Sequence, residues 1–177
     1  SHDQTFRYMF LEAAGNANLS FDSLSKDYCY SFVLQHPKNR IVVPFSETKL
    51  YLIACYAIND ASSCVTEVSR SDMEENVKGV GDIHFPKQFS FTTYDELVNN
   101  WASDDVDYKI MGVVVKNSVT GDRTKIRNPN YERVRALRGN HAKLQYQYLV
   151  LRKDRNVSNY IKYFGEASPT FKTYRDQ

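Results

Sequence analysis

Residues 111–140 read MGVVVKNSVTGDRTKIRNPNYERVRALRGN, and this stretch decides the fold. A run of valines is followed by a polar turn that holds Gly121, where a hairpin needs a positive φ. We therefore expect a β-hairpin. In its returning strand, Arg123, Lys125 and Arg127 are separated by single residues, and alternate side chains of a strand share one face. The sequence therefore predicts a row of three cations on one face of the hairpin.

A helix is expected directly after this strand. Asn128 is a preferred N-cap residue, and Pro129 suits the first helical position. Apolar residues then recur at helical spacing until Gly139 ends the helix. The free amide groups of a helix start favour negative charge, so the cation row and the helix start together predict binding of an anion. Phosphate is the commonest anion with these preferences.

Composition indicates a globular protein with an uneven charge distribution. The chain has 177 residues, of which 42% are hydrophobic and 14% aromatic, enough for a sizeable core. The net charge is only +2, but residues 121–155 carry ten Lys or Arg and three Asp or Glu, whereas residues 1–120 carry ten and sixteen. Such a basic block suits a polyanionic partner. The alternative is a solvated basic surface with no ligand.

The cysteines and the apolar runs narrow the class of protein further. Cys29, Cys55 and Cys64 are an odd set without C-x-x-C spacing, so we expect neither a disulfide framework nor a metal site. A reducing, intracellular compartment fits this usage, whether cytoplasmic, nuclear or viral. No apolar run approaches the roughly 20 residues that span a bilayer, so we expect no membrane partner.

The order of patterns predicts an α+β fold, in which an antiparallel sheet is flanked by helices and followed by a small C-terminal helical extension. We expect strands at 28–34, 40–45, 49–57, 109–116 and 123–127. We expect helices at 3–14, within 66–77, at 94–102 after a Thr93-x-x-Glu96 capping box, from 144 onward and at 157–164. His36 is expected in a surface turn between the first two strands.

Four ordered segments together resemble a known family. These are YSFVL at 30–34, NRIV at 39–42, GVVV at 112–115 and KIR at 125–127. They resemble motifs III, IV and V of phage-type ATP-dependent RNA ligases, members of the covalent nucleotidyltransferase superfamily. The resemblance runs from about residue 28 to residue 139. It implies a partial nucleotidyltransferase-like domain at 1–139 and the start of a helical extension at 140–177.

The resemblance also implies a reaction and the residues that serve it. In the family, ATP and Mg²⁺ support the joining of RNA 5′-phosphate and 3′-hydroxyl ends, and cations stabilise the charge that builds on phosphate. Carried over by motif, Lys125 and Arg127 are the catalytic contacts to the α-phosphate. The implied nucleotide-binding residues are Phe32, Gly112, Lys125 and Arg127. We expect nucleic acid to contact Arg123, Arg133, Arg135 and Arg138. The alternative for the strand is a row of exposed cations that guards a sheet edge against aggregation.

The chain also departs from the family pattern. The K-x-D-G motif that supplies the nucleophilic lysine is absent. Val33 and Met111 occupy positions where the family carries carboxylates, so we expect no metal site and no activity from this chain alone. Gln35 and His36 are the nearest polar replacements.

Two classes of function therefore stay open. The first is an RNA ligase fragment whose nucleophile lies upstream or on another chain. The second is a non-catalytic relative that binds nucleic acid or a nucleotide, or serves as a structural or assembly component. If half of the module is missing, apolar faces of the sheet should be exposed or covered by a partner protein chain.

Overall fold

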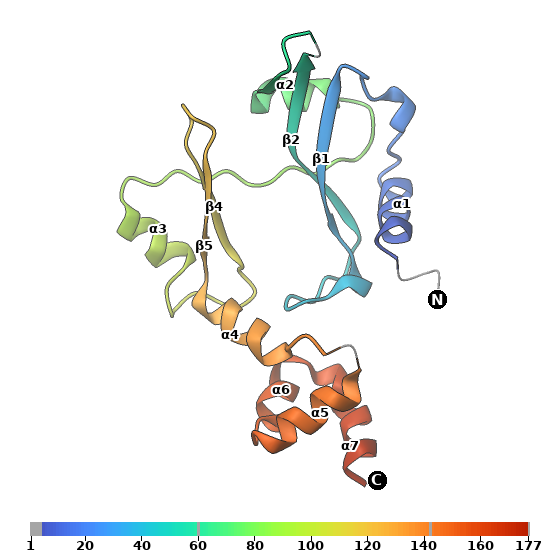
Figure 1. Ribbon diagram of the computed structural model, residues 1–177, viewed down its shortest axis with the longest axis vertical. Coiled ribbons are helices and arrows are strands. Elements are labelled where there is room, and N and C mark those ends of the chain that lie inside the picture. Colours follow the sequence, from blue (N-terminus) through green and yellow to red (C-terminus); the bar gives the residue numbers. More distant parts are fainter. Residues whose placement is uncertain (1–4, 60, 142, 177) are drawn as a thin grey trace. The chain divides into compact units, whose positions relative to one another are not determined.

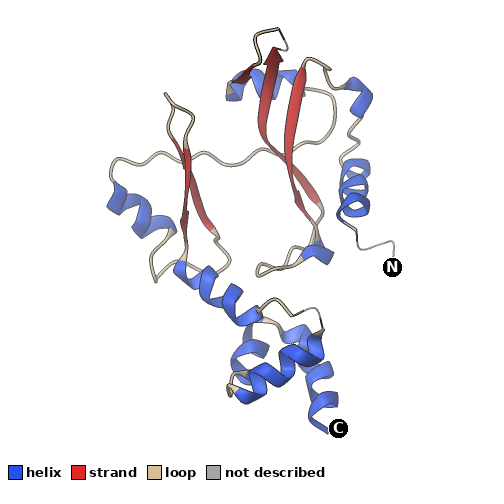
Figure 2. Cartoon of the chain, viewed as in Figure 1, coloured by secondary structure: helices blue, strands red, loops and turns tan. Residues whose placement is uncertain are grey.

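The computed structural model describes residues 5–59, 61–141 and 143–176. Over these residues the protein is mixed α+β, with seven α-helices and two small antiparallel sheets of three and two strands (Figure 2). The predicted fold class is therefore confirmed, although the strands lie in two sheets rather than in one. None of the described helices combines the length and the apolar character that a membrane crossing requires.

The chain divides into two compact units. Unit 1 comprises Ser1–Arg40 and Pro44–Phe89, and unit 2 comprises Ile41–Val43 and Ser90–Gln177. The elements of unit 1 are α1 (Phe6–Asn16), η2 (Phe21–Ser23), β1 (Tyr28–Gln35), η3 (Pro37–Asn39), β2 (Lys49–Asn59), β3 (Cys64–Glu67) and α2 (Arg70–Asn76). Those of unit 2 are α3 (Tyr94–Trp101), β4 (Gly112–Lys116), β5 (Arg123–Arg127), α4 (Pro129–Arg138), α5 (Leu144–Lys153), α6 (Val157–Tyr163), η4 (Gly165–Ala167) and α7 (Ser168–Asp176). The predicted boundary at residue 139 separates a partial nucleotidyltransferase-like domain from a helical extension. It depends on the family resemblance and stays a prediction.

The sheet of unit 1 has the strand order β1-β2-β3, with both pairs antiparallel (Figure 1). One face of the sheet is covered by helices. Leu50 is buried against alanines of α1, and Leu52 is buried with Met73 of α2. Cys55 lies in the same core as Leu52, where burial raises the pKa of its thiol, so the thiol stays protonated. α1 confirms the first predicted helix, although two of its predicted residues, 3 and 4, lie outside the described chain.

The strand predicted at 40–45 is wrong. These residues form bends without strand pairing, and Pro44 has no amide to donate to a ladder. Val42 is 1% exposed and packs in a core of unit 2 with Val134. An apolar run predicts burial, but it does not distinguish a strand from a buried loop. The third strand of the sheet is instead β3, which precedes the helix predicted within 66–77 and found as α2.

The expected surface position of His36 is also wrong. This side chain is 2% exposed, and its Nδ1 atom accepts a hydrogen bond of 3.0 Å from the Lys38 amide at the start of η3. Its Nε2 atom lies 3.5 Å from a carboxylate oxygen of Glu12 on α1. The imidazole therefore connects the end of β1 to α1.

The sheet also carries exposed apolar side chains. Ile58 of β2 and Val65 of β3 are directly opposite each other, and both are exposed, as is Val33 of β1. A partner chain over these residues stays a prediction.

The helix predicted at 94–102 is confirmed as α3, the first helix of unit 2. The Thr93 hydroxyl accepts a hydrogen bond of 3.2 Å from the Glu96 amide, and the Glu96 carboxylate accepts one of 2.8 Å from the Thr92 amide. This reciprocal capping satisfies two amides that a helix start leaves without partners.

The helices of unit 2 from α4 onward share one hydrophobic core. Its buried aromatic members are Tyr131 of α4, Tyr148 of α5, Tyr160 of α6, Phe164, and Phe171 of α7. α5 and α6 confirm two predicted helices, whereas α7 was not predicted. Side chains of α4 pack in the same core as those of α5, α6 and α7. The position of α4 therefore depends on these three helices.

Candidate functional site

The candidate site begins at the β4–β5 hairpin, whose turn is organised by Asn117. The Asn117 Oδ1 atom accepts hydrogen bonds from the Val119 amide at 2.8 Å and the Thr120 amide at 3.1 Å. Gly121 has a φ of +77°, as predicted. Side chains of Asn hold such turns because they replace a backbone acceptor locally. The turn fixes the register of the two strands, which pair in the antiparallel direction without a bulge.

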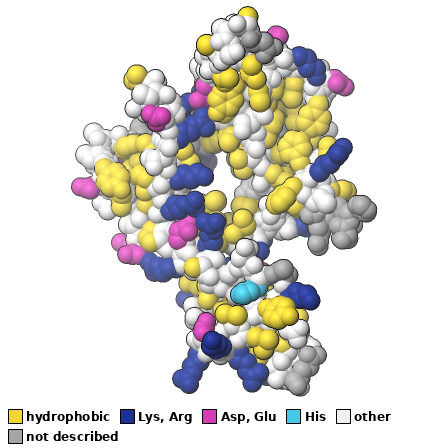
Figure 3. All heavy atoms as spheres, in the orientation of Figure 1, with side chains coloured by type: hydrophobic (Ala, Val, Ile, Leu, Met, Phe, Trp, Pro, Cys, Tyr) yellow, Lys and Arg dark blue, Asp and Glu magenta, His cyan; other side chains and the backbone are white. Residues whose placement is uncertain are grey.

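The predicted cation row is present on β5. Arg123, Lys125 and Arg127 are all exposed, and Ile126 between them is half-buried. Successive members of such a row lie about 7 Å apart, since a strand rises about 3.3 Å per residue. Within the described chain, the side chain of Lys125 has no hydrogen-bond or ion-pair partner. Figure 3 shows Lys and Arg side chains gathered in a line over the hairpin.

The partner strand adds a fourth cation to this face. Lys116 lies opposite Arg123, Val114 opposite Lys125, and Gly112 opposite Arg127. Like charges directly opposite each other on a sheet are destabilising. The sequence predicted that Lys116 lies at the end of a strand. Only the strand register shows that Arg123 lies opposite it.

Gly112 has a backbone role at the other end of the hairpin. Its φ is +116°, and a Cβ atom there would overlap the Ile126 carbonyl oxygen and lie 2.9 Å from the Arg127 Cα atom. The absence of a side chain therefore lets β4 approach the residue that ends the cation row.

Arg127 does not stand alone, because Glu132 of α4 lies beside it. The Arg127 Nη1 atom is 2.9 Å from Glu132 Oε1, and Glu132 Oε2 is 3.5 Å from the Arg135 Nη1 atom. One carboxylate thus bridges two guanidinium groups that were both predicted as site residues. Sequence reasoning missed Glu132, since no local pattern joins a strand residue to a helix residue five positions later.

Asn128 fixes the junction between β5 and α4. It is 0% exposed, and its Oδ1 atom accepts from the Asn130 amide at 2.9 Å, which confirms the predicted N-cap. Its Nδ2 atom donates to the carbonyl oxygens of Asp107 and Ile110, each at 2.8 Å. The cap therefore also holds the loop before β4. Because the Asn130 amide is occupied, the case for anion binding depends on side-chain cations rather than on the helix start.

The remaining predicted arginines point to different neighbours. Arg133 pairs with Asp104, in the loop before β4, and Arg138 Nη1 lies 3.5 Å from the Gly139 carbonyl oxygen. Arg133 and Arg135 are two residues apart, so they project from nearly opposite sides of the helix. The structure therefore brings Arg135, but not Arg133, into the group with Arg127.

Phe32 belongs to unit 1, whereas the other predicted nucleotide-binding residues belong to unit 2. Its ring is partly buried and lies 6.2 Å from the Phe10 ring in an edge-on arrangement. Packing in the core of unit 1 therefore accounts for this aromatic side chain. Val33 and Met111, which occupy positions where the resemblance predicts carboxylates, are both exposed.

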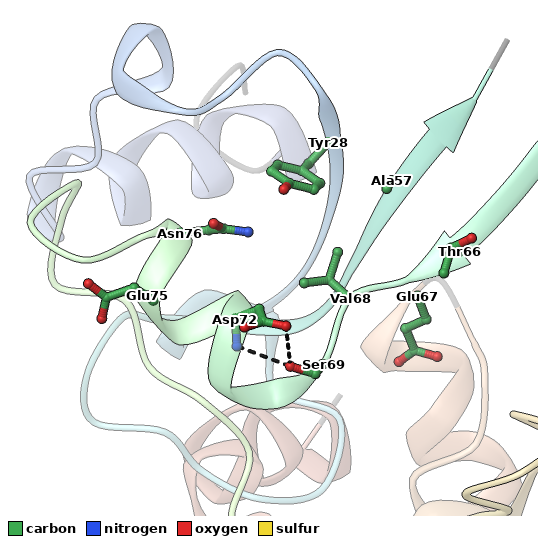
Figure 4. A pocket seen from close by; sticks show the side chains of 9 residues that line it. All are labelled: Tyr28, Ala57, Thr66, Glu67, Val68, Ser69, Asp72, Glu75 and Asn76. Atoms are coloured by element: carbon green, nitrogen blue, oxygen red, sulfur yellow. Dashed lines mark hydrogen bonds between the residues drawn. The ribbon is translucent and has the colours of Figure 1, made fainter.

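A pocket in unit 1 has the opposite character from the hairpin. Its lining residues include Glu67, Asp72 and Glu75, and the Asn76 amide nitrogen points toward the middle of the labelled side chains (Figure 4). Ser69 lines the pocket and is the N-cap of α2. Its Oγ atom accepts a hydrogen bond of 3.2 Å from the Asp72 amide. The negative charge of these acidic residues disfavours phosphate, so this pocket is not a candidate for the same ligand. Among the described residues, no three His, Cys, Asp or Glu side chains are grouped to hold a metal ion.

Comparison with known proteins adds no family assignment. No protein-family model matches the chain. No curated protein matches it either. The function is therefore inferred from the residues of the site and from the motif resemblance.

Proposed function

We propose that this chain is the phosphate-binding part of an RNA ligase-like nucleotidyltransferase, and that β5 holds phosphate groups of a nucleotide or of RNA. The observation that carries this proposal is the exposed row of Arg123, Lys125 and Arg127 on one strand face. In this proposal Lys125 and Arg127 contact the phosphate at which the reaction occurs, and Arg123 contacts the RNA.

The contact chemistry supports this assignment. Arg presents a planar group of N–H donors that matches two phosphate oxygens, whereas Lys supplies a compact charge. Cations that are already positioned stabilise the negative charge that develops during phosphoryl or nucleotidyl transfer. ATP and Mg²⁺ are the cofactors of the proposed whole reaction. The unpaired cysteines fit an intracellular site of action, where thiols stay reduced.

The second candidate is a non-catalytic module that binds RNA or a nucleotide. It is favoured by Val33 and Met111, because neither side chain can bind a metal ion or a ribose hydroxyl as a carboxylate does. Both candidates require the same phosphate contacts. They differ in whether a lysine nucleophile is supplied from outside this sequence.

The proposed contacts predict a salt-dependent affinity for single-stranded RNA. Replacing Lys125 and Arg127 together by Ala should weaken binding and flatten the plot of log affinity against log salt by about 1.4 units, or roughly 0.7 per lost phosphate contact. Filter binding across a salt series measures both quantities. The matched control replaces Arg152 and Lys153, two exposed cations at the end of α5. Equal losses from the two pairs would reduce β5 to part of a diffuse basic surface.

A covalent adenylate is not expected on this chain alone. None of its lysines lies in a K-x-D-G motif, and both expected carboxylates are replaced. Incubation with labelled ATP and Mg²⁺ should therefore leave the protein without acid-stable label. A label that disappears when one lysine is replaced would contradict both the motif assignment and the expected inactivity.

A further inference from the structure

Glu132 is the acidic side chain that lies within the predicted cation group. Each of its carboxylate oxygens meets a different guanidinium, Arg127 at 2.9 Å and Arg135 at 3.5 Å. The Arg127 side chain is 46% exposed, that of Glu132 is 37% exposed and that of Arg135 is 49% exposed. They are therefore accessible to a ligand while they remain paired with one another.

A carboxylate here has two opposing effects on a bound phosphate. Its charge repels the phosphate, and this repulsion is reduced by water and by salt. Its hydrogen bond with Arg127 and its ion pair with Arg135 restrict these two side chains, which otherwise lose freedom when they bind a ligand. Arg127 has five N–H donors, so a bond from Nη1 to Glu132 leaves donors for a phosphate.

We infer that Glu132 is a positioning residue, which holds the guanidinium groups of Arg127 and Arg135 together as one phosphate clamp. This inference rests on the proposed function, since it names the residue that organises the same site. The geometry supports it because the carboxylate spans the C-terminal end of β5 and the second turn of α4. Without this bridge, the two arginines belong to separate elements and move independently.

Two variants of Glu132 separate positioning from simple repulsion. Glu132→Ala removes both the charge and the hydrogen bond with Arg127, whereas Glu132→Gln removes the charge but keeps a carbonyl oxygen that accepts from Arg127. Positioning predicts that Glu132→Ala weakens binding of single-stranded RNA roughly two- to fivefold, the range of an exposed ion pair. It predicts that Glu132→Gln binds at least as tightly as the unmodified chain. If both variants bind more tightly, Glu132 only repels the ligand and the inference is overturned.

A double-mutant cycle tests whether Glu132 acts through Arg127. In an Arg127→Ala background, Glu132→Ala should weaken binding less than it does in the unmodified chain, because only the ion pair with Arg135 is left to lose. In a Lys125→Ala background, Glu132→Ala should weaken binding by its full factor, because Lys125 does not contact Glu132. Equal weakening in both backgrounds would overturn the positioning role.

The same data distinguish failure of this inference from failure of the proposed function. If Lys125→Ala and Arg127→Ala leave RNA binding unchanged, β5 does not hold phosphate, and both proposals fail. If they weaken binding while Glu132→Ala tightens it, only the positioning role fails. Circular dichroism of each variant checks that the fold is retained.

Discussion

Replacing Asn128 by Asp should lower the free energy of unfolding by about 3–5 kcal/mol, the cost of an unpaired buried charge. The two side chains have the same shape, and the new carboxylate still accepts from the Asn130 amide. However, it places a charged oxygen where Nδ2 now donates to the carbonyl oxygens of Asp107 and Ile110 at 2.8 Å. Those carbonyls lose their donor in a site that is 0% exposed. Urea denaturation measures the loss.

The matched control is the same substitution at Asn117. Its side chain is exposed and only accepts hydrogen bonds, from the Val119 and Thr120 amides. A carboxylate accepts them equally well, so Asn117→Asp should change stability by less than about 0.5 kcal/mol. The loss in Asn128→Asp should also shrink in acid, where the new carboxyl gains a proton and can donate to one carbonyl. Similar stabilities for the two variants would contradict the assigned role of Asn128.

Replacing Gly112 by Ala should lower the free energy of unfolding by about 3 kcal/mol. One part of the loss comes from the backbone conformation, and the other from overlap of the new Cβ atom with β5. The φ of +116° is rarely adopted by residues with a Cβ atom, and this atom would overlap the Ile126 carbonyl oxygen. Both close neighbours are backbone atoms of β5, so no side-chain rotation relieves the clash. We expect the hairpin to shift at Arg127, and RNA binding should weaken together with the stability.

Gly121→Ala is the control for the conformational part alone. Gly121 has a φ of +77°, but a Cβ atom there meets nothing within 4 Å. Gly121→Ala should lower the free energy of unfolding by about 1–2 kcal/mol, the cost of the left-handed conformation. It should weaken RNA binding less than Gly112→Ala, because Arg127 lies at the opposite end of β5 from the turn. If the two glycine variants lose equal stability, close approach of the strands at Gly112 is not important.

Local sequence signals predicted much of the candidate site. The returning strand, the cation alternation and the caps of α4 at Asn128 and Gly139 are all present in the structure. These features depend on side-chain alternation, on φ preferences and on hydrogen bonds between residues a few positions apart. The site residues themselves stay predictions until binding is measured.

The longer-range relationships were not predictable in the same way. The segment 40–45 has the β-branched composition of a strand, but Val42 is buried in a helical core instead. Sequence reasoning found the cap at Asn128 but not the carbonyls that its Nδ2 atom binds, about twenty residues earlier in the chain. It also placed Arg127 and Arg135 in the site without the carboxylate that joins them.

The hairpin and helix of residues 111–140, with three cations on one strand face, follow from the sequence because neighbouring residues set these properties. The bridge from Glu132 to Arg127 and Arg135, and the need for a glycine at position 112, arise only when the elements pack together. The reason is physical. Packing and hydrogen bonding between elements depend on which segments meet in space, and periodicity within one segment carries no information about its partner.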